Sequence, residues 1–288
     1  SHGVTAILKY PLRLLSVQQV QRVADILAQA ERIRLTMPEQ ANASPFTVGY
    51  YVGDGNTPNK IEDKTHKRLC SMSQQELDEE YRVVDRCPFC RNTSVHVIYN
   101  RDARKLIHHC ATDSCDSGGD LPVYITDSDV YHYLPSVVIS TIDKMAAIGY
   151  QRRFKNIFGS VKRRCPVHGY HELKHCDEKE CLCDQEIVRL YDPAPSLYIQ
   201  DELHLVRESL GTYASHYEAL IQYFGEFYSD SQRKAKIIGA TATISHYQAQ
   251  VQQLYLKDAI LFPCPSPDLK KNFYSYIDDN DLHRLVLG

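Results

Sequence analysis

Residues 195–206 read Pro-Ser-Leu-Tyr-Ile-Gln-Asp-Glu-Leu-His-Leu-Val and contain the features that decide the fold. The apolar run 197–199 follows two prolines and is too short for a helix, which predicts a buried strand. Asp201 and Glu202 come directly after it, with His204 two residues further on. Open α/β sheets bind ligands at the carboxyl ends of their strands, so we expect a site here. One carboxylate of such a pair can hold Mg²⁺ while the other activates water in phosphoryl transfer.

A second short strand is predicted over residues 236–244, Lys-Ile-Ile-Gly-Ala-Thr-Ala-Thr-Ile, which ends in small and hydroxyl residues. The sequences Asp-Glu-Leu-His and Gly-Ala-Thr-Ala-Thr together resemble motifs II and III of superfamily 2 helicases of the DExH class. The resemblance implies that Asp201 holds Mg²⁺ through water and that Glu202 activates the attacking water. It also implies that His204 couples the nucleotide site to its neighbours. The residues implied to link the ATP state to domain closure are Thr241, Ala242 and Thr243.

The composition is that of an ordinary globular protein. The chain has 288 residues, of which 43% are hydrophobic and 24% charged, and this length allows one large domain or two. The net charge is −3, so any surface for nucleic acid must be local. No run of about eighteen apolar residues occurs, and the beginning lacks the basic-then-apolar pattern of a signal peptide. We therefore expect a cytoplasmic protein without a membrane partner.

Cysteines are concentrated in the middle of the chain. Eight of the ten lie between residues 87 and 183 in closely spaced sets, and without a secretory signal this pattern favours metal ligation over disulfides. In the first set, two cysteine pairs flank a segment of hairpin length, and four thiolates complete a closed tetrahedral zinc site. The hairpin strands are predicted over 95–99 and 105–107, with His108 and His109 as bystanders. The predicted ligands are Cys87, Cys90, Cys110 and Cys115.

A second metal site is predicted over residues 165–188. Cys165 and His168 have the spacing of a zinc knuckle and form one pair of ligands. Spacing does not decide which residues complete a closed tetrahedral site. The favoured completion is Cys176 with either Cys181 or Cys183, and His171 and His175 are further alternatives.

Two more stretches resemble helicase motifs that contact the nucleic-acid backbone. A strand over residues 4–10, a Pro-Leu-Arg-Leu-Leu turn and a helix capped by Ser16 resemble motif Ia. A strand over residues 130–141 that ends in hydroxyl residues resembles motif Ib. The contacts implied by the resemblance are Arg13 in the first motif and Ser140, Thr141 and Lys144 in the second.

A basic run follows motif Ib. No acid appears between Asp143 and Glu172, whereas six basic residues fall within thirteen positions. Such a run is either a solvated face or a nucleic-acid track, and both interpretations remain open. The run consists of Arg152, Arg153, Lys155, Lys162, Arg163 and Arg164, and the first two are the candidates for contact.

A long amphipathic helix is predicted after Gly211. Its apolar residues recur at helical spacing and are expected to pack in the core rather than to stack on bases. These residues are Tyr213, Tyr217, Leu220, Ile221 and Phe224.

The order of the motifs predicts an α/β fold: a RecA-like, P-loop NTPase-type, mostly parallel sheet with helices on both faces, interrupted by small zinc-ribbon-like insertions. This order resembles the first RecA-like domain of a superfamily 2 helicase. The cysteine clusters on either side of motif Ib most resemble the large helicase subunit of DISARM-type antiphage defence systems. The expected divisions are RecA-like segments over 1–85, 121–164 and 189–262, zinc-binding insertions over 86–120 and 165–188, and a connector over 263–288.

One motif of the helicase family is missing. No Gly-x-x-x-x-Gly-Lys-Thr/Ser occurs, so the sequence offers no backbone cradle or lysine for the β- and γ-phosphates. We therefore expect a fragment, inactive alone, of an ATP-dependent helicase or translocase that moves on DNA. Two structural Zn²⁺ ions are expected in the chain, with Mg²⁺, ATP and defence-complex subunits as cofactors and partners of the whole protein. The alternative is a zinc-dependent module that binds nucleic acid or protein without catalysis.

Overall fold

The computed structural model describes residues 3–53, 57–176, 181–229, 234–242, 246–262, 267–268, 271, 273 and 276–277. The chain divides into two units, Ser1–Ile244 and Ser245–Gly288, and each is described by itself. The described part of the second unit includes helix α6, Tyr247–Tyr255. Within the residues described, no helix is both long and apolar enough to cross a membrane.

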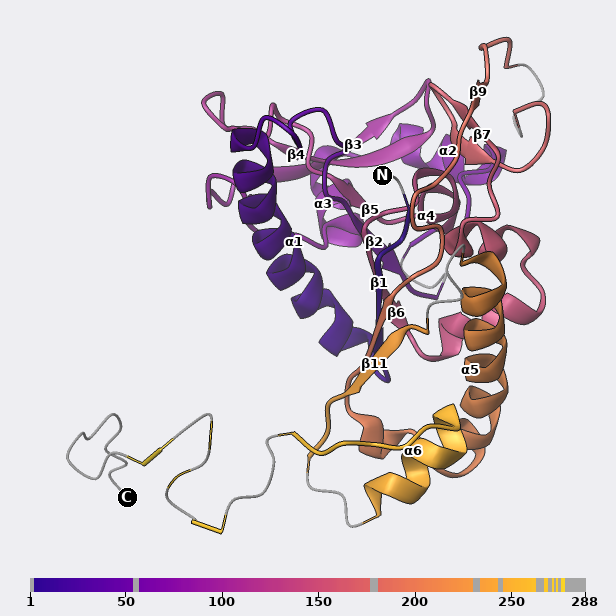
Figure 1. Ribbon diagram of the computed structural model, residues 1–288. Coiled ribbons are helices and arrows are strands. Elements are labelled where there is room, and N and C mark those ends of the chain that lie inside the picture. The colour runs from indigo at the N-terminus through magenta and orange to yellow at the C-terminus, as the bar shows by residue number, and fades with distance from the viewer. Residues whose placement is uncertain are drawn as a thin grey trace. The chain divides into compact units, whose positions relative to one another are not determined.

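A six-stranded sheet forms the centre of the first unit (Figure 1). Its strand order is β11-β10-β1-β6-β2-β5, and every pairing is parallel. This arrangement confirms the predicted α/β fold with a mostly parallel sheet. The strands are β1 Ala6–Tyr10, β2 Val48–Tyr51, β5 Val123–Tyr124, β6 Val137–Thr141, β10 Leu197–Gln200 and β11 Lys236–Gly239.

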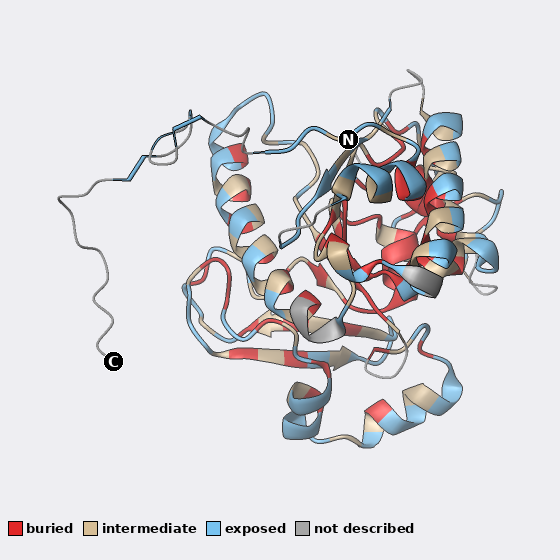
Figure 2. Ribbon diagram, turned by 90° about the horizontal axis from the view of Figure 1, so that it is seen from below, coloured by how far each residue is buried: buried red, intermediate tan, exposed pale blue. Residues whose placement is uncertain are grey.

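Side chains along β1 alternate between two cores, as expected for a strand that is buried on both faces. Leu8 packs in one core with Ala24 of helix α1, Arg13–Thr36. Ile7 packs in the other with Ile221 of helix α5, Glu208–Tyr228. Figure 1 shows these helices on opposite sides of the sheet, and in Figure 2 buried strands lie between helices that expose their outer faces.

A buried ion pair joins the sheet to α5. Lys9 of β1 and Glu218 of α5 form a salt bridge, and only 1% and 7% of their side chains are exposed. The Nζ atom of Lys9 also lies 5.7 Å from the centre of the Tyr198 ring. Burying two charges is tolerated only when they are paired, because a lone charge keeps its full desolvation cost. The pair therefore fixes which side of α5 faces the sheet.

That side agrees with the predicted one in part, because Ile221 is buried and Phe224 packs against the same core. α5 buries Ala214, Glu218 and Ile221, whereas Tyr213 and Leu220 are 65% and 40% exposed. Glu218 lies within the buried stripe, and a pattern of apolar residues does not identify a charged residue as buried.

Lys9→Met is expected to lower the free energy of unfolding by about 3–5 kcal/mol, because the buried carboxylate of Glu218 would lose its partner. The double variant Lys9→Met/Glu218→Leu is the matched control and should regain most of this loss, since it removes both charges. Urea unfolding followed by circular dichroism measures both differences. A single variant as stable as the unmodified protein would show that the pair contributes nothing.

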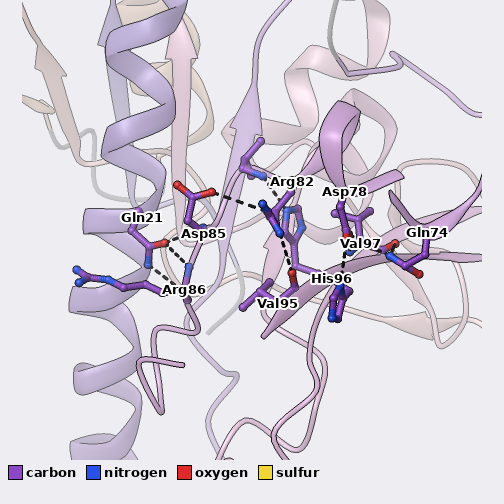
Figure 3. Close-up of polar contacts among 11 residues, drawn as sticks. Gln21, Gln74, Asp78, Arg82, Asp85, Arg86, Val95, His96 and Val97 are labelled. Carbon is purple, nitrogen blue, oxygen red and sulfur yellow. Dashed lines mark hydrogen bonds and ion pairs between the residues drawn. The ribbon is translucent and has the colours of Figure 1, made fainter. Parts of the chain in front are cut away.

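The predicted hairpin is confirmed and is held against helix α3 (Figure 3). The carboxylate of Asp78 accepts hydrogen bonds from the backbone N–H of Val97 at 2.6 Å and pairs with Nδ1 of His96 at 2.8 Å. The side-chain amide of Gln74 donates to the carbonyl of Val97 at 3.0 Å. The elements involved are α2 Asp63–Ser71, α3 Gln74–Tyr81, β3 Val95–Asn100 and β4 Lys105–Cys110.

The segment that enters the hairpin is also tied to α1. The side-chain oxygen of Gln21 accepts from the backbone N–H groups of Asp85 and Arg86 at 3.0 and 3.2 Å (Figure 3). The insertion is therefore bonded both to a helix of its own and to the helix that covers the sheet.

A three-stranded antiparallel sheet, in the order β8-β7-β9, occupies the second insertion. Gly169 opens β8 with a φ of +78°, and a Cβ added there would lie 2.2 Å from the carbonyl oxygen of His132 in helix α4. Only glycine fits this approach of the insertion to the main body. The elements are α4 Asp127–Tyr133, β7 Arg163–Cys165, β8 Gly169–His171 and β9 Glu186–Ile187.

Two predicted elements are wrong in part. α1 begins at Arg13, so Ser16 is not its cap; the buried Ser16 hydroxyl instead lies 3.2 Å from that of Tyr50. Residues 130–133 are helical rather than extended, because the side chain of Thr126 caps α4 by accepting a hydrogen bond from the N–H of Asp129. The strand that precedes motif Ib is therefore confirmed only over 137–141.

Candidate functional site

The two predicted carboxylates lie at the carboxyl end of β10. The N–H of Asp201 donates to the carbonyl of Lys9 in β1 at 3.0 Å, which extends the sheet pairing by one residue. The Asp201 carboxylate then accepts from the N–H of Glu202 at 2.9 Å. Glu202 has a left-handed backbone, with φ of 48° and ψ of 47°. This sparsely populated conformation turns the chain sharply at the end of the strand.

The two helicase-like motifs meet at this edge of the sheet. The N–H of Leu203 donates to the carbonyl of Ala240 at 3.0 Å. Nδ1 of His204, in the short helix η3 (Leu203–Leu205), lies 3.2 Å from the hydroxyl of Thr241 and 3.3 Å from the Glu202 carboxylate. His204 thus bridges the acidic pair and the strand end that follows β11. Of the other predicted residues of motif III, Ala242 follows Thr241 with an exposed side chain, and Thr243 lies outside the described residues.

Two carboxylates are accessible at this edge of the sheet. Asp201 and Glu202 are half-buried, so their carboxylates are open to a ligand while the backbone that holds them is fixed. Burial, together with the charge of Asp201, raises the pKa of Tyr10 to about 12. Tyr10 therefore stays neutral beside the acidic pair. Paired carboxylates of this kind hold hard cations such as Mg²⁺ through oxygen or water.

Two of the three residues predicted to contact phosphate near motif Ib, Ser140 and Lys144, are engaged inside the protein, whereas the hydroxyl of Thr141 is buried without a hydrogen-bond partner among the described residues. The hydroxyl of Ser140 is buried and donates to the carbonyl of Thr141 at 2.9 Å. Nζ of Lys144 lies 2.6 Å from the carboxylate of Asp127 and 2.9 Å from the side-chain oxygen of Asn59. Their contact with phosphate stays a prediction.

The predicted arginines lie in two places. Arg13 is the first residue of α1, and its side chain lies outside the described part of the chain. Arg152 and Arg153 open the 3₁₀ segment η2, Arg152–Phe158, with Arg152 exposed at the surface. Contact of these side chains with nucleic acid also stays a prediction.

The first cysteine set forms a compact group. The sulfur atoms of Cys87 and Cys115 are 3.5 Å apart and those of Cys90 and Cys110 are 3.7 Å apart, too far for disulfide bonds of about 2.05 Å. All four lie within 4.8 Å of one another. A tetrahedral zinc site with Zn–S bonds of about 2.3 Å places its sulfurs about 3.8 Å apart, so the group fits a zinc ion.

The protonation of these thiols is uneven without a cation. Burial raises the pKa of the Cys87 thiol to about 12. At Cys115 burial acts in the same direction, but hydrogen bonds from Ser117 and the neighbouring thiols outweigh it and lower the pKa to about 7. Four thiolates could share this space only around a cation, because like charges repel one another at such short distances. His108 and His109 are not in the group, as predicted.

The second group contains Cys165, His168, Cys176 and Cys181, again within 4.8 Å of one another. The distances are 3.6 Å between the sulfurs of Cys165 and Cys181 and 3.3 Å between Cys176 and Nδ1 of His168. They fit tetrahedral coordination, for which sulfur and nitrogen lie about 3.6 Å apart. At Cys165 burial raises the pKa, but backbone hydrogen bonds from His168 and Val167 outweigh it and lower the pKa to about 6, which favours the ligating thiolate.

The structure favours Cys181 over Cys183, the choice that spacing left open. A hydrogen bond with Cys181 raises the pKa of the Cys183 thiol to about 11, so Cys183 stays protonated beside the group. Of the two histidines considered, His171 bonds instead to the carbonyl of Leu173, and His175 is exposed outside the group. Both groups could therefore hold zinc, as predicted, with four ligands each.

Sequence comparison places the chain among known proteins. No protein-family model matches it. The DISARM protein DrmA of Bacillus paralicheniformis is 33% identical over 295 residues, which cover 95% of this chain and 26% of DrmA. The chain is related to DrmA. The match confirms the predicted resemblance to a DISARM-type protein, and the chain spans about a quarter of the length of DrmA.

Two solved structures are similar to the DrmA-related chain. They are the crystal structures of the DUF1998 helicase MrfA, alone and bound to DNA, with TM-scores of 0.40 and 0.32 and identities of 11% and 12%. They cover 87% and 89% of this chain and 21% and 24% of the MrfA chains.

Proposed function

We propose that the chain is part of an ATP-dependent DNA helicase or translocase that acts in antiphage defence. The observation that carries this proposal is the meeting of Asp201, Glu202 and Thr241 at one edge of a parallel sheet, bridged by His204. The acidic pair and Thr241 lie about forty positions apart in sequence. If the two motifs resembled those of helicases only by chance, there would be no reason for them to be in contact. The relation to DrmA supports the defence role.

The proposed roles of the residues are those implied by the resemblance to helicase motifs II and III. Mg²⁺ supplies charge neutralisation at the transferred phosphoryl group when it is bound with ATP. Asp201 offers its carboxylate to the hydrated cation, and Glu202 accepts the proton of the attacking water. His204, which contacts both Glu202 and Thr241, would couple the nucleotide site to the strand end that follows β11.

The proposal also includes two structural Zn²⁺ ions, one in each cysteine-rich group. Both groups provide four ligands and leave no open position for a reacting water, so their role is to hold the insertions in shape. The sequence lacks the phosphate-binding glycine loop with its lysine, and the chain matches a quarter of DrmA. We therefore propose that the isolated chain does not hydrolyse ATP efficiently and that DNA and defence-complex subunits are partners of the whole protein.

The test compares the full-length parent protein with the 288-residue chain in an ATPase assay with and without single-stranded DNA. The expected result is DNA-stimulated turnover by the parent and none above background by the chain. Robust turnover by the chain alone would refute its assignment as a dependent part. A parent that binds DNA without hydrolysing ATP would favour a zinc-dependent binding module.

A further inference from the structure

A pocket of about 480 Å³ lies beside the second metal group, outside the helicase-like motifs. Its walls come from η2, from the β7–β9 pair and from residues 172–174. This volume is within the range of about 300–1,000 Å³ that is typical of ligand sites. Four of the lining residues are basic, one is acidic and two are aliphatic. The basic residues, here called the basic pocket residues, are Arg152, Lys162, Arg163 and Lys174.

Among the described residues, the positive charge of this pocket is largely uncompensated. Its one carboxylate, Glu172, is already paired with Lys155 at 2.6 Å and lies 3.8 Å from Arg152. Within the described part of the chain, the side chains of Lys162, Arg163 and Lys174 form no ion pair. A surplus of cations around a hollow favours an anionic ligand, because their positive potentials add there.

The strand register explains why Arg163 of β7 lines the pocket and the neighbouring Arg164 does not. Arg163 is paired with Ile187 and Arg164 with Glu186, so the side chains of each pair share a face of the small sheet. Arg163 and Ile187 both line the pocket. Arg164 faces the other way, where it lies 3.9 Å from the Glu186 carboxylate and 5.9 Å from the centre of the Tyr170 ring.

Aliphatic side chains lie beside these cations. Leu173 and Ile187 are 53% and 80% exposed, and both line the pocket. Guanidinium and ammonium groups bind phosphate, whereas an exposed aliphatic surface suits the face of an unstacked base or a sugar. A duplex keeps its bases stacked and offers no such face, so the combination fits a single strand.

We propose that this basic pocket binds the phosphate backbone of single-stranded DNA, with the second metal-binding segment as one of its walls. The inference rests on the proposed function and extends it: strand contact is placed on an insertion, away from the nucleotide edge. Arg163 and Lys162 bind phosphate oxygens, and Ile187 and Leu173 contact a base or sugar. The segment over 165–188 then has a binding role that its closed metal site alone does not provide.

The test measures binding of a fluorescein-labelled 20-residue oligothymidylate to the 288-residue chain by fluorescence anisotropy, without nucleotide. Lys162→Gln/Arg163→Gln is expected to weaken binding at least about tenfold at low salt and to lower the salt slope by about 1.4, at about 0.7 per lost phosphate contact on a single strand. Arg164→Gln is the matched control for Arg163→Gln alone, because each of these variants removes one positive charge and the two side chains lie on opposite faces of β7. Its affinity should stay within about twofold, and circular dichroism checks that all variants fold.

Several results would overturn the inference. Equal effects of Arg163 and Arg164 substitutions would mean that general charge, and not the pocket, attracts DNA. Equal or tighter binding of a 20-base-pair duplex would contradict the single-strand preference, and more effective displacement by poly-glutamate than by unlabelled oligothymidylate would point to an acidic protein. The ATPase assay of the parent separates the two proposals. If the parent hydrolyses ATP but the pocket variants bind DNA as well as the unmodified chain, only the pocket proposal is refuted. If the pocket variants lose DNA binding but the parent does not hydrolyse ATP, only the ATPase proposal is refuted.

Discussion

Cys87→Ser is expected to remove one of two zinc ions from the chain and to unfold the first insertion. Cys87 is fully buried, and its sulfur lies 3.5 Å from that of Cys115. Structural zinc contributes about 10–16 kcal/mol of apparent binding free energy in small metal-dependent domains, and loss of one of four ligands forfeits much of it. Because three of the four cysteines belong to the same core as α1, the damage should extend to that helix.

The measurements are zinc content by elemental analysis and the thermal unfolding midpoint. Cys70→Ser is the matched control: Cys70 is half-buried, lies outside both metal groups, and has only a weak contact of 3.7 Å with His66. It should retain two zinc ions and an unchanged midpoint. A Cys87→Ser protein that keeps both ions would contradict the four-thiolate site.

Glu202→Gln in the full-length parent is expected to lower ATP turnover by about two to four orders of magnitude, the contribution of a general base. Glutamine has nearly the same shape but cannot accept the proton of the attacking water, so nucleotide binding should be largely retained. The left-handed backbone at this position is unaffected, because both residues carry the same Cβ and Cγ atoms.

Turnover is measured under saturating ATP and DNA, and nucleotide binding by equilibrium titration. Glu226→Gln provides the control, because Glu226 is an exposed acid on the outer side of α5. It should leave both quantities unchanged. Unaltered turnover in Glu202→Gln would remove Glu202 from its assigned role as base.

Sequence spacing was sufficient where chemistry demands a fixed geometry. The strand ending at Asp201 and the hairpin between the cysteine pairs were predicted close to their observed bounds. Thiolate ligands must converge on one metal ion, and parallel strands end at the same edge of a sheet. The local sequence pattern was therefore enough to predict both features. The choice between Cys181 and Cys183, with His171 and His175 as further alternatives, stayed open, because several residues of one loop can reach the same point.

Tertiary contacts decided the elements that sequence did not predict correctly. Serine often caps the beginning of a helix, but Ser16 lies within α1, where its hydroxyl contacts that of Tyr50. The basic pocket was missed as a unit because its walls are brought together by the pairing of Arg163 with Ile187, twenty-four positions apart. A signal for Lys9 was present: a lysine within an apolar strand indicates a buried partner, which only the fold identifies as Glu218.

The alternation of side chains along β1 also protects the sheet against incorrect assembly. A slip of one residue would exchange the two faces of the strand and place Lys9 among the apolar side chains beneath α1. There the ammonium group would be desolvated without Glu218, at a cost of several kcal/mol, on the order of the whole stability of a domain. Lys9 thus helps to fix the register of β1 in the sheet. Its charge can be buried at low cost only in the alignment that places it beside Glu218.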